Sequence, residues 1–208
     1  CYYNKLIINK YMNIQDFLKI IKNRFGVLMA FLGFFIAIAL LVTLVQPLKY
    51  RASSRLLVMQ NNTGSDFYTI SKSNQYFGAL LAETVSSGSF FELASSANSN
   101  INWAYFGDNY KKQVKTWKKT IEARSVGDTG IMEINIYHPN SEQARLISLA
   151  VDNLILTQNS LYQNSDTNIK MRIIDQPIIS AYPVKPNLLI NFGAALSLGI
   201  LLGLAYSY

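Results

Sequence analysis

Two uncharged apolar runs near the ends of the 208-residue chain constrain its fold more than any other feature. They cover residues 27–45 and 188–206, and neither contains Asp, Glu, Lys or Arg. About 20 helical residues at a rise of 1.5 Å cross the roughly 30 Å hydrocarbon core of a bilayer. A surface helix of a soluble protein has a polar face, which both runs lack. We therefore predict transmembrane helices over residues 27–46 and 188–208.

A cleaved signal peptide is the alternative interpretation of the first run. Its apolar stretch is longer than the roughly 7–15 residues of a signal peptide, and no small-residue cleavage site follows it. Residues 46–49 read instead as an ordinary helix exit at the membrane surface. We expect this helix to be a retained anchor.

Basic residues before the first run predict that the N-terminal segment, residues 1–26, is cytoplasmic. The segment between the runs, residues 47–187, is then extracytoplasmic, and the C-terminus returns to the cytoplasm. Arg51 and Arg55 follow the first run, but a long domain is translocated largely regardless of its charge. We expect a multi-pass protein of the cytoplasmic (inner) membrane. The basic residues before the first run, opposed only by Asp16, are Lys5, Lys10, Lys19, Lys22 and Arg24.

The two ends of the chain carry weaker patterns. Residues 1–11 show no capping or periodic signal, and we expect them to be foreign to the native protein. Residues 13–25 have apolar side chains on one helical face, with basic residues placed for anionic headgroups. Because Tyr208 falls at the end of the second span, we expect the native protein to continue into a cytoplasmic tail.

The segment between the spans alternates strand and helix patterns. Period-two alternation predicts strands over residues 50–59, 120–125 and 131–137, the last two joined by a Gly127–Gly130 turn. Helices are predicted over residues 73–86, 89–93 and 108–119. A further helix of about 20 residues is predicted from Ser141, with an apolar face that ends at Leu161. The last predicted element is a strand over residues 169–175. The expected helix caps are Ser89 and Asp108. The predicted fold class is α+β, with a mixed sheet and helices on one face.

This order of elements resembles the polysaccharide co-polymerase family, the Wzz-type chain-length determinants. Members carry a strand of the form Tyr-x-Ala-x-x-x-Leu-x-Val after the first span, here residues 50–58. A Gly-x-x-x-Ile-x-Ile strand, here 130–136, precedes a polar turn and a helix that bears Ala144. The approach to the second span contains Pro183 and Pro186, which stiffen it. The resemblance extends from about Met12 to the end of the chain.

The resemblance implies a non-enzymatic co-polymerase that regulates the chain length or export of a surface polysaccharide. The compact domain is similar to members from capsule and exopolysaccharide systems, because the long helical extension of the larger O-antigen (lipopolysaccharide) regulators is missing. The implied partners are further copies of the chain in a homo-oligomer, a membrane polysaccharide polymerase and a lipid-linked glycan.

Two other functions stay open at this stage. One is a transmembrane adaptor that activates a cytoplasmic tyrosine kinase, which an aromatic or basic tail after Tyr208 would favour. The other is an accessory subunit of an envelope secretion system. Genes for glycosyltransferases beside this one would argue against the secretion subunit.

The residues do not point to an enzyme, a cofactor or a metal. His138 is the single histidine and lies before Pro139, where a structural or solvated role is the usual one. Cys1 is predicted on the other side of the membrane, so the two cannot form a zinc site. The net charge of +7 could suit nucleic acid, but an extracytoplasmic domain does not meet that partner.

Two groups of residues are candidate contact sites. A basic face beside Trp117 could bind an acidic glycan, a lipid pyrophosphate or anionic headgroups; a solvated helix with a packed tryptophan is the alternative. In the second span, small residues recur every four positions, which permits close helix packing or reflects the general abundance of glycine in such helices. The basic face consists of Lys111, Lys112, Lys115, Lys118 and Lys119, and the small residues are Ala195, Gly199 and Gly203.

Overall fold

The computed structural model describes residues 24–60, 66–97, 100–157 and 169–207. The chain divides into two compact units, one made of residues 48–184 and the other of the flanking segments. The predicted N-terminal segment up to residue 23 and the end of the long helix at Leu161 lie outside the described residues.

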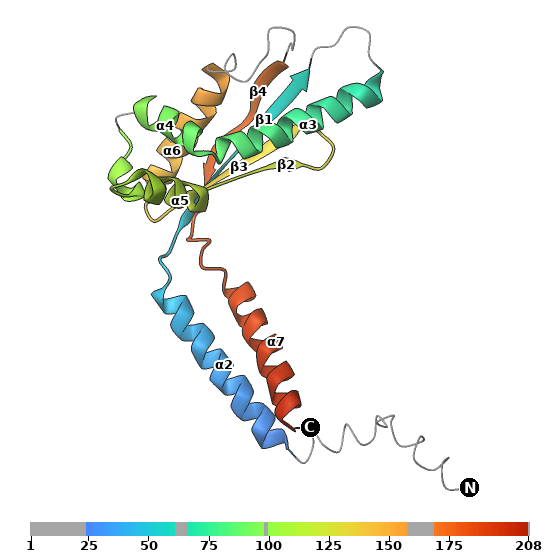
Figure 1. Ribbon diagram of the computed structural model, residues 1–208, viewed down its shortest axis with the longest axis vertical. Helices are drawn as coiled ribbons and strands as arrows, with labels where there is room; N and C mark the ends of the chain where they lie inside the picture. Colours follow the sequence, from blue (N-terminus) through green and yellow to red (C-terminus); the bar gives the residue numbers. More distant parts are fainter. Residues whose placement is uncertain (1–23, 61–65, 98–99, 158–168, 208) are drawn as a thin grey trace, which may run out of the picture. The chain divides into compact units, whose positions relative to one another are not determined.

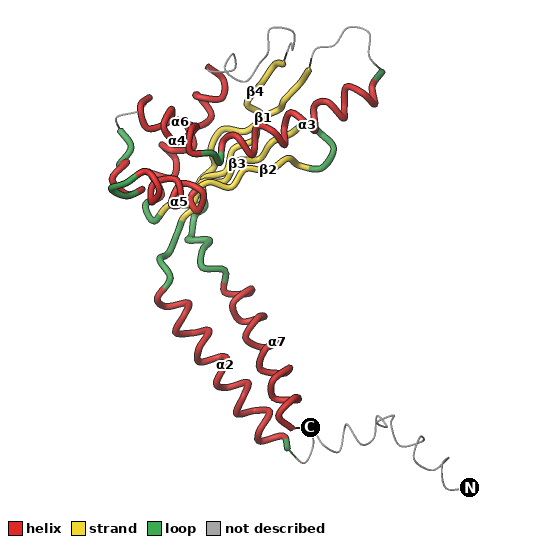
Figure 2. Tube along the Cα trace, in the orientation of Figure 1, coloured by secondary structure: helices red, strands yellow, loops and turns green. Residues whose placement is uncertain are grey.

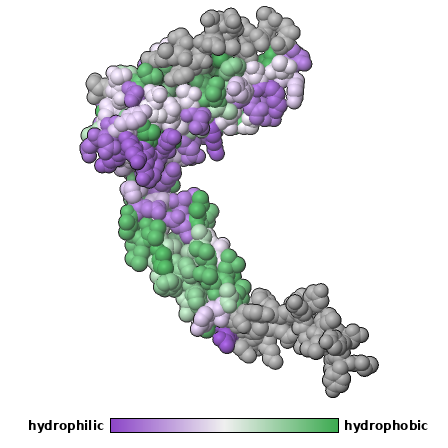
Figure 3. Space-filling model, in the orientation of Figure 1, coloured by the Kyte–Doolittle hydropathy of each residue, from purple (hydrophilic) through white to green (hydrophobic). Residues whose placement is uncertain are grey.

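The flanking segments form two apolar helices, α2 (Phe25–Val45) and α7 (Leu188–Ser207). Both are long and apolar enough to cross a membrane, and most of their side chains are exposed. Their surface is almost continuously hydrophobic (Figure 3). Asn187 begins α7, because its side-chain oxygen accepts a hydrogen bond of 3.3 Å from the Ile190 backbone amide. These bounds agree with the predicted spans within two residues at each end.

The central unit is an α+β domain built on a four-stranded sheet of order β2-β3-β1-β4. Every neighbouring pair in it is antiparallel, so the predicted mixed sheet is wrong. β3 and β4 run in the same direction and are joined through a helix, but β1 lies between them and pairs with both (Figure 1). The strands are β1 (Tyr50–Gln60), β2 (Ile121–Val126), β3 (Ile131–His138) and β4 (Ile169–Ile179).

The helices of this unit pack on one face of the sheet, as predicted. Alternate residues of β1 and β3, including Leu56 and Ile134, are fully buried beneath them. Phe91, Phe106 and Trp117 extend the core with ring centroids 5.3–5.7 Å apart. Figure 2 shows the helices in red, namely α3 (Phe67–Val85), α4 (Gly88–Ala97), α5 (Tyr110–Thr120) and α6 (Ser141–Thr157), with a 3-10 turn at Trp103–Phe106.

The helix starts differ from those expected because other polar residues supply the caps. Asp66 accepts a hydrogen bond of 2.7 Å from the Thr69 amide, so α3 begins six residues earlier than predicted. Ser87 rather than Ser89 caps α4. Asn109 rather than Asp108 caps α5, through a hydrogen bond of 2.9 Å from the Lys112 amide.

The first and last strands of the domain lie side by side. Ala52 of β1 pairs with Ile179 of β4, and the register continues outward to a hydrogen bond of 2.8 Å from the Val184 amide to the Lys49 carbonyl. The chain therefore enters and leaves the domain at the same end of the sheet. β4 continues through Pro177, which an edge strand tolerates because one side of it needs no ladder hydrogen bonds.

Candidate functional site

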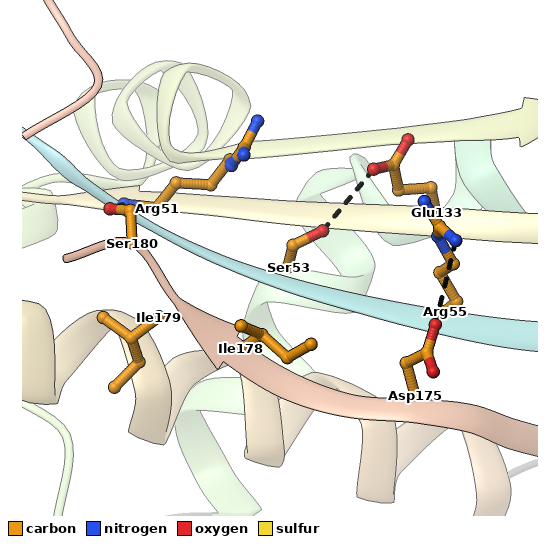
Figure 4. Close-up of a pocket in the computed structure, with 8 residues that line it drawn as sticks. All are labelled: Arg51, Ser53, Arg55, Glu133, Asp175, Ile178, Ile179 and Ser180. Atoms are coloured by element: carbon orange, nitrogen blue, oxygen red, sulfur yellow. Dashed lines mark hydrogen bonds and ion pairs between the residues drawn. The ribbon is translucent and has the colours of Figure 1, made fainter. Parts of the chain in front are cut away.

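The face of the sheet opposite the helices is polar and forms a groove. Its side chains come from the middle strands β1 and β3, from the edge strand β4 and from Ser180, which follows β4 (Figure 4). The groove has a volume of about 320 Å³. It is lined by Arg51, Ser53, Arg55, Glu133, Asp175, Ile178, Ile179 and Ser180.

Glu133 lines the groove and is held in place by an arginine. Arg124 of β2 donates two hydrogen bonds, of 2.9 and 2.8 Å, from Nε and Nη2 to the same carboxylate oxygen. The Arg124 guanidinium lowers the pKa of Glu133, and the charges of Arg55 and Arg51 act in the same direction. Glu133 is therefore a fixed, ionised acceptor in the middle of the sheet face.

Arg55 lies between two carboxylates. It faces Glu133 across the β1–β3 pair and forms an ion pair of 3.9 Å with Asp175 across the β1–β4 pair. Both side chains of that ion pair are about half exposed, so it contributes little to stability. Its effect is to orient the guanidinium along the groove.

At the other end of the groove, Arg51 lies beside a buried tyrosine, Tyr137. Arg51 and Tyr137 are directly paired in the β1–β3 register. Burial, followed by the neighbouring Glu122 carboxylate, raises the pKa of the Tyr137 phenol, while Arg51 lowers it. The phenol is thus kept neutral, as a hydroxyl that both donates and accepts hydrogen bonds. Ser180 closes this end, where its Oγ accepts a hydrogen bond of 3.0 Å from the Arg51 backbone amide.

The groove offers guanidinium donors, carboxylate acceptors, hydroxyls and the exposed side chain of Ile178 within one shallow surface. A ligand that fits it presents both hydroxyl groups and hydrocarbon edges. The described residues contain no group of three His, Cys, Asp or Glu side chains that could hold a metal ion. His138 lies at the end of β3, where its Nδ1 accepts a hydrogen bond of 3.0 Å from the Asn140 amide and burial lowers its pKa.

The five lysines of the predicted basic face are exposed along α5. Lys112 forms an ion pair of 3.6 Å with Asp108. Trp117 does not belong to this surface: it is fully buried and its Nε1 donates a hydrogen bond of 3.0 Å to the Val85 carbonyl. Trp117 is thus a core residue, as the alternative interpretation of this helix expected. Hydrophilic surface gathers over α5 (Figure 3).

The small residues of α7 face α2. Ala195, Gly199 and Gly203 are buried, although most of this helix is exposed. A Cβ atom added at Gly199 would lie 3.2 Å from the Leu32 Cα, and one at Gly203 would lie 3.4 Å from the Leu28 Cα. Asn191 Nδ2 also donates a hydrogen bond of 3.0 Å to Thr43 Oγ1, which joins the two helices. Small residues therefore permit close backbone approach here.

The two prolines of the predicted membrane approach, Pro183 and Pro186, are half-buried and lie between β4 and α7. Neither contributes to the groove or to the basic face. Each lacks a backbone N–H and has a fixed φ, which limits the conformations of this connection.

Sequence reasoning did not identify the groove or the polar pair beneath it. Ser54 projects from β1 into the core and donates a hydrogen bond of 2.8 Å to Asp152 of α6. Burial raises the pKa of Asp152 to about 7, and the bond from Ser54 opposes the shift. The signal was present, because Ser148 and Asp152 are polar residues at helical spacing on the face that packs on the sheet.

No protein-family model matches the chain, and a search of curated proteins found no match either.

Proposed function

We propose that this protein is a non-enzymatic membrane co-polymerase that regulates the chain length or export of a surface polysaccharide. The proposal rests on the order of elements, in which an α+β domain with the strand patterns of the Wzz-type family stands between two apolar helices. The protein works as a homo-oligomer beside a membrane polymerase that extends a lipid-linked glycan.

The pairing of β1 with β4 is the structural observation that most supports this proposal. It brings the first and last strands of the domain together at one end of the sheet. A domain arranged this way can be held by two helices that cross the same bilayer in opposite directions. Both termini then lie on the cytoplasmic side of the inner membrane and the domain lies outside it.

The polar groove is the contact site that we propose for the growing glycan. Its fixed donors and acceptors, Arg51, Arg55 and Glu133, suit the hydroxyl and acidic groups of a polysaccharide, and Ile178 suits the hydrocarbon face of a sugar ring. Weak, repeated contacts of this kind would retain a chain without cleaving it.

Reporter fusions test the topology. A fusion after Lys22 should behave as cytoplasmic and one after Asn140 as extracytoplasmic. The reverse pattern would place the domain among cytoplasmic nucleotides and end the proposal.

Deletion of the gene tests the function. We expect the length distribution of a surface polysaccharide to change while the composition of its repeat unit stays the same. The double variant Arg51→Gln/Arg55→Gln should shift the modal length in the same direction. Arg145→Gln is the matched control, because this arginine forms an exposed ion pair with Glu142 on α6, away from the groove. A changed repeat unit with an unchanged length profile would argue for an enzyme.

A further inference from the structure

The junction end of the sheet, where the chain enters and leaves the domain, brings basic and apolar side chains together. The register places Ile121, Ile136, Ala52 and Ile179 in one row across all four strands. The residues just outside this row are therefore neighbours, although they come from four different parts of the sequence. Adjacent strands are about 4.8 Å apart, so the row is about 14 Å wide.

The last turn of α5 directly precedes β2 and lies outside this row. Lys118 and Lys119 precede Ile121 by three and two positions, and both are exposed. Lys111 and Lys115 lie at spacings of four on the same helix, so four lysines point away from the buried Trp117. Lysines in the last turn are also favoured by the negative end of the helix dipole.

Two exposed apolar side chains lie outside the row where the chain enters β1 and leaves β4. Leu48 precedes β1 with 62% of its surface exposed, and Tyr182 follows β4 with 81% exposed. Tyrosine is enriched where a protein meets the membrane–water interface, because its ring is apolar and its hydroxyl is wet. Exposed apolar side chains next to a cluster of lysines are typical of a surface that contacts the membrane interface.

The connection from α2 to the domain is short. Only residues 46–49 separate the end of α2 from β1. A chain extends by at most about 3.6 Å per residue, so Tyr50 cannot lie further than about 18 Å from Val45. When α2 spans a bilayer, that distance reaches from the end of the hydrocarbon core into the headgroup layer and just above it.

We propose that the junction end is a lipid-binding surface, in which Lys111, Lys115, Lys118 and Lys119 bind the phosphates of anionic phospholipids while Leu48 and Tyr182 enter the interface. The inference rests on the membrane-spanning helices of the proposed function, but not on its role in polysaccharide synthesis. Each basic residue near an anionic surface increases binding by a factor of about five. Four of them therefore fix the orientation of the domain on the membrane.

The test uses the full chain in liposomes, with Cys1→Ser and a nitroxide at Lys115→Cys. Collision of the nitroxide with a nickel-chelating lipid headgroup is measured in phosphatidylcholine alone and with phosphatidylglycerol. We expect severalfold more collision in the anionic bilayer, lost at high salt and in a Lys111→Gln/Lys118→Gln/Lys119→Gln background. The matched control is a nitroxide at Lys170→Cys, on the strand pair at the opposite end of the sheet, which should stay silent.

Alkaline extraction of the same liposomes separates the two hypotheses. An inserted protein whose collision signal is the same in neutral and anionic bilayers would overturn the lipid-binding surface and leave the proposed function standing. A protein that is extracted would overturn both. A signal that appears only after a polyprenyl pyrophosphate is added would also overturn the proposal, since the lysines would then recognise the glycan carrier.

Discussion

The Ser54 hydroxyl and the Asp152 carboxylate meet at 2.8 Å in the core of the domain, between β1 and α6. Both residues are almost completely buried, and the second carboxylate oxygen of Asp152 has no hydrogen-bond partner among the described residues. A carboxylate in this position is costly when ionised, which explains why burial raises its pKa to about 7.

The stability of the domain should therefore fall as the pH rises from about 4 to about 7. In this window the folded state holds a proton on Asp152 that the unfolded state, with a pKa of about 3.9, has released. The total loss is on the order of 4 kcal/mol at pH values above 7. Asp152→Asn keeps an acceptor for Ser54 and removes the titration, so the variant should be the more stable protein at pH 8.

Thermal unfolding of both proteins in detergent across this range measures the difference. The difference in stability between the two proteins at each pH reports Asp152 alone, because His138 is present in both. Burial lowers the pKa of His138, so this residue makes both proteins less stable as the pH falls through the ordinary pKa of histidine. A difference that does not vary with pH would show that Asp152 is ionised in the folded domain.

The β2–β3 hairpin offers a matched pair of glycines. Gly130 and Gly127 both have positive φ, at 68° and 54°. A Cβ added at Gly130 would lie 2.8 Å from the Asn74 Cβ and 2.9 Å from the Val58 carbonyl oxygen, whereas one at Gly127 would meet nothing within 4 Å.

Gly127→Ala should cost about 1 kcal/mol of unfolding free energy, from its backbone conformation alone. Gly130→Ala should cost at least about 1–2 kcal/mol more, because α3 must move away from the hairpin. Chemical denaturation followed by tryptophan fluorescence compares the two. Equal losses would mean that α3 does not pack on this turn in solution.

Trp117 should be the most sensitive position of α5. In Trp117→Phe the Val85 carbonyl loses the donor that lies 3.0 Å away, which costs about 1–3 kcal/mol before any packing loss. Lys115→Gln on the same helix is the exposed control and should stay within about 0.5 kcal/mol of the parent. Near-equal stabilities of the two variants would contradict the buried position of the indole.

The α2–α7 contact can be tested with three glycines of one helix. Gly199→Leu/Gly203→Leu introduces side chains against Leu32 and Leu28, and should separate the helices without preventing insertion. Gly193→Leu is the control, since a Cβ there meets nothing within 4 Å.

Cysteines at Ala39 and Ala195, which line one groove between the helices, report the separation by crosslinking in membranes. We expect the crosslink to be lost in the double variant and kept in Gly193→Leu. Crosslinking that persists in the double variant would show that the domain alone holds the helices together. A loss of higher oligomers in the same gel would extend the role of these glycines to assembly.

Local patterns predicted most of the elements but not their arrangement. The period-two alternation of β1 and β3 and the Gly127–Gly130 turn are short-range signals, and the structure confirms them. The order of elements predicted a mixed sheet, whereas the structure has β1 between β3 and β4 and every neighbouring pair is antiparallel. No local sequence pattern indicates that β1 lies between β3 and β4.

The groove was missed for the same physical reason. Arg55, Glu133 and Asp175 are isolated charges in the sequence, and only the long-range register makes them neighbours. The cap of α5 was missed on a finer scale, because Asp108 and Asn109 are both good capping residues and the structure places Asn109 in the capping position. The basic face, by contrast, follows from one helix and needs no partner to be recognised.

The central position of β1 has a consequence for biogenesis. This strand leaves the ribosome first, yet both of its neighbours come later, β3 about 80 residues on and β4 at the far end of the domain. Until β3 and β4 have been synthesised, β1 presents two unpaired edges, each a template for wrong pairing. The sheet closes only when β4, the last of the four strands to be made, pairs with β1. The domain therefore cannot complete its fold before residues 169–179 have emerged, and the edges of β1 need protection until then.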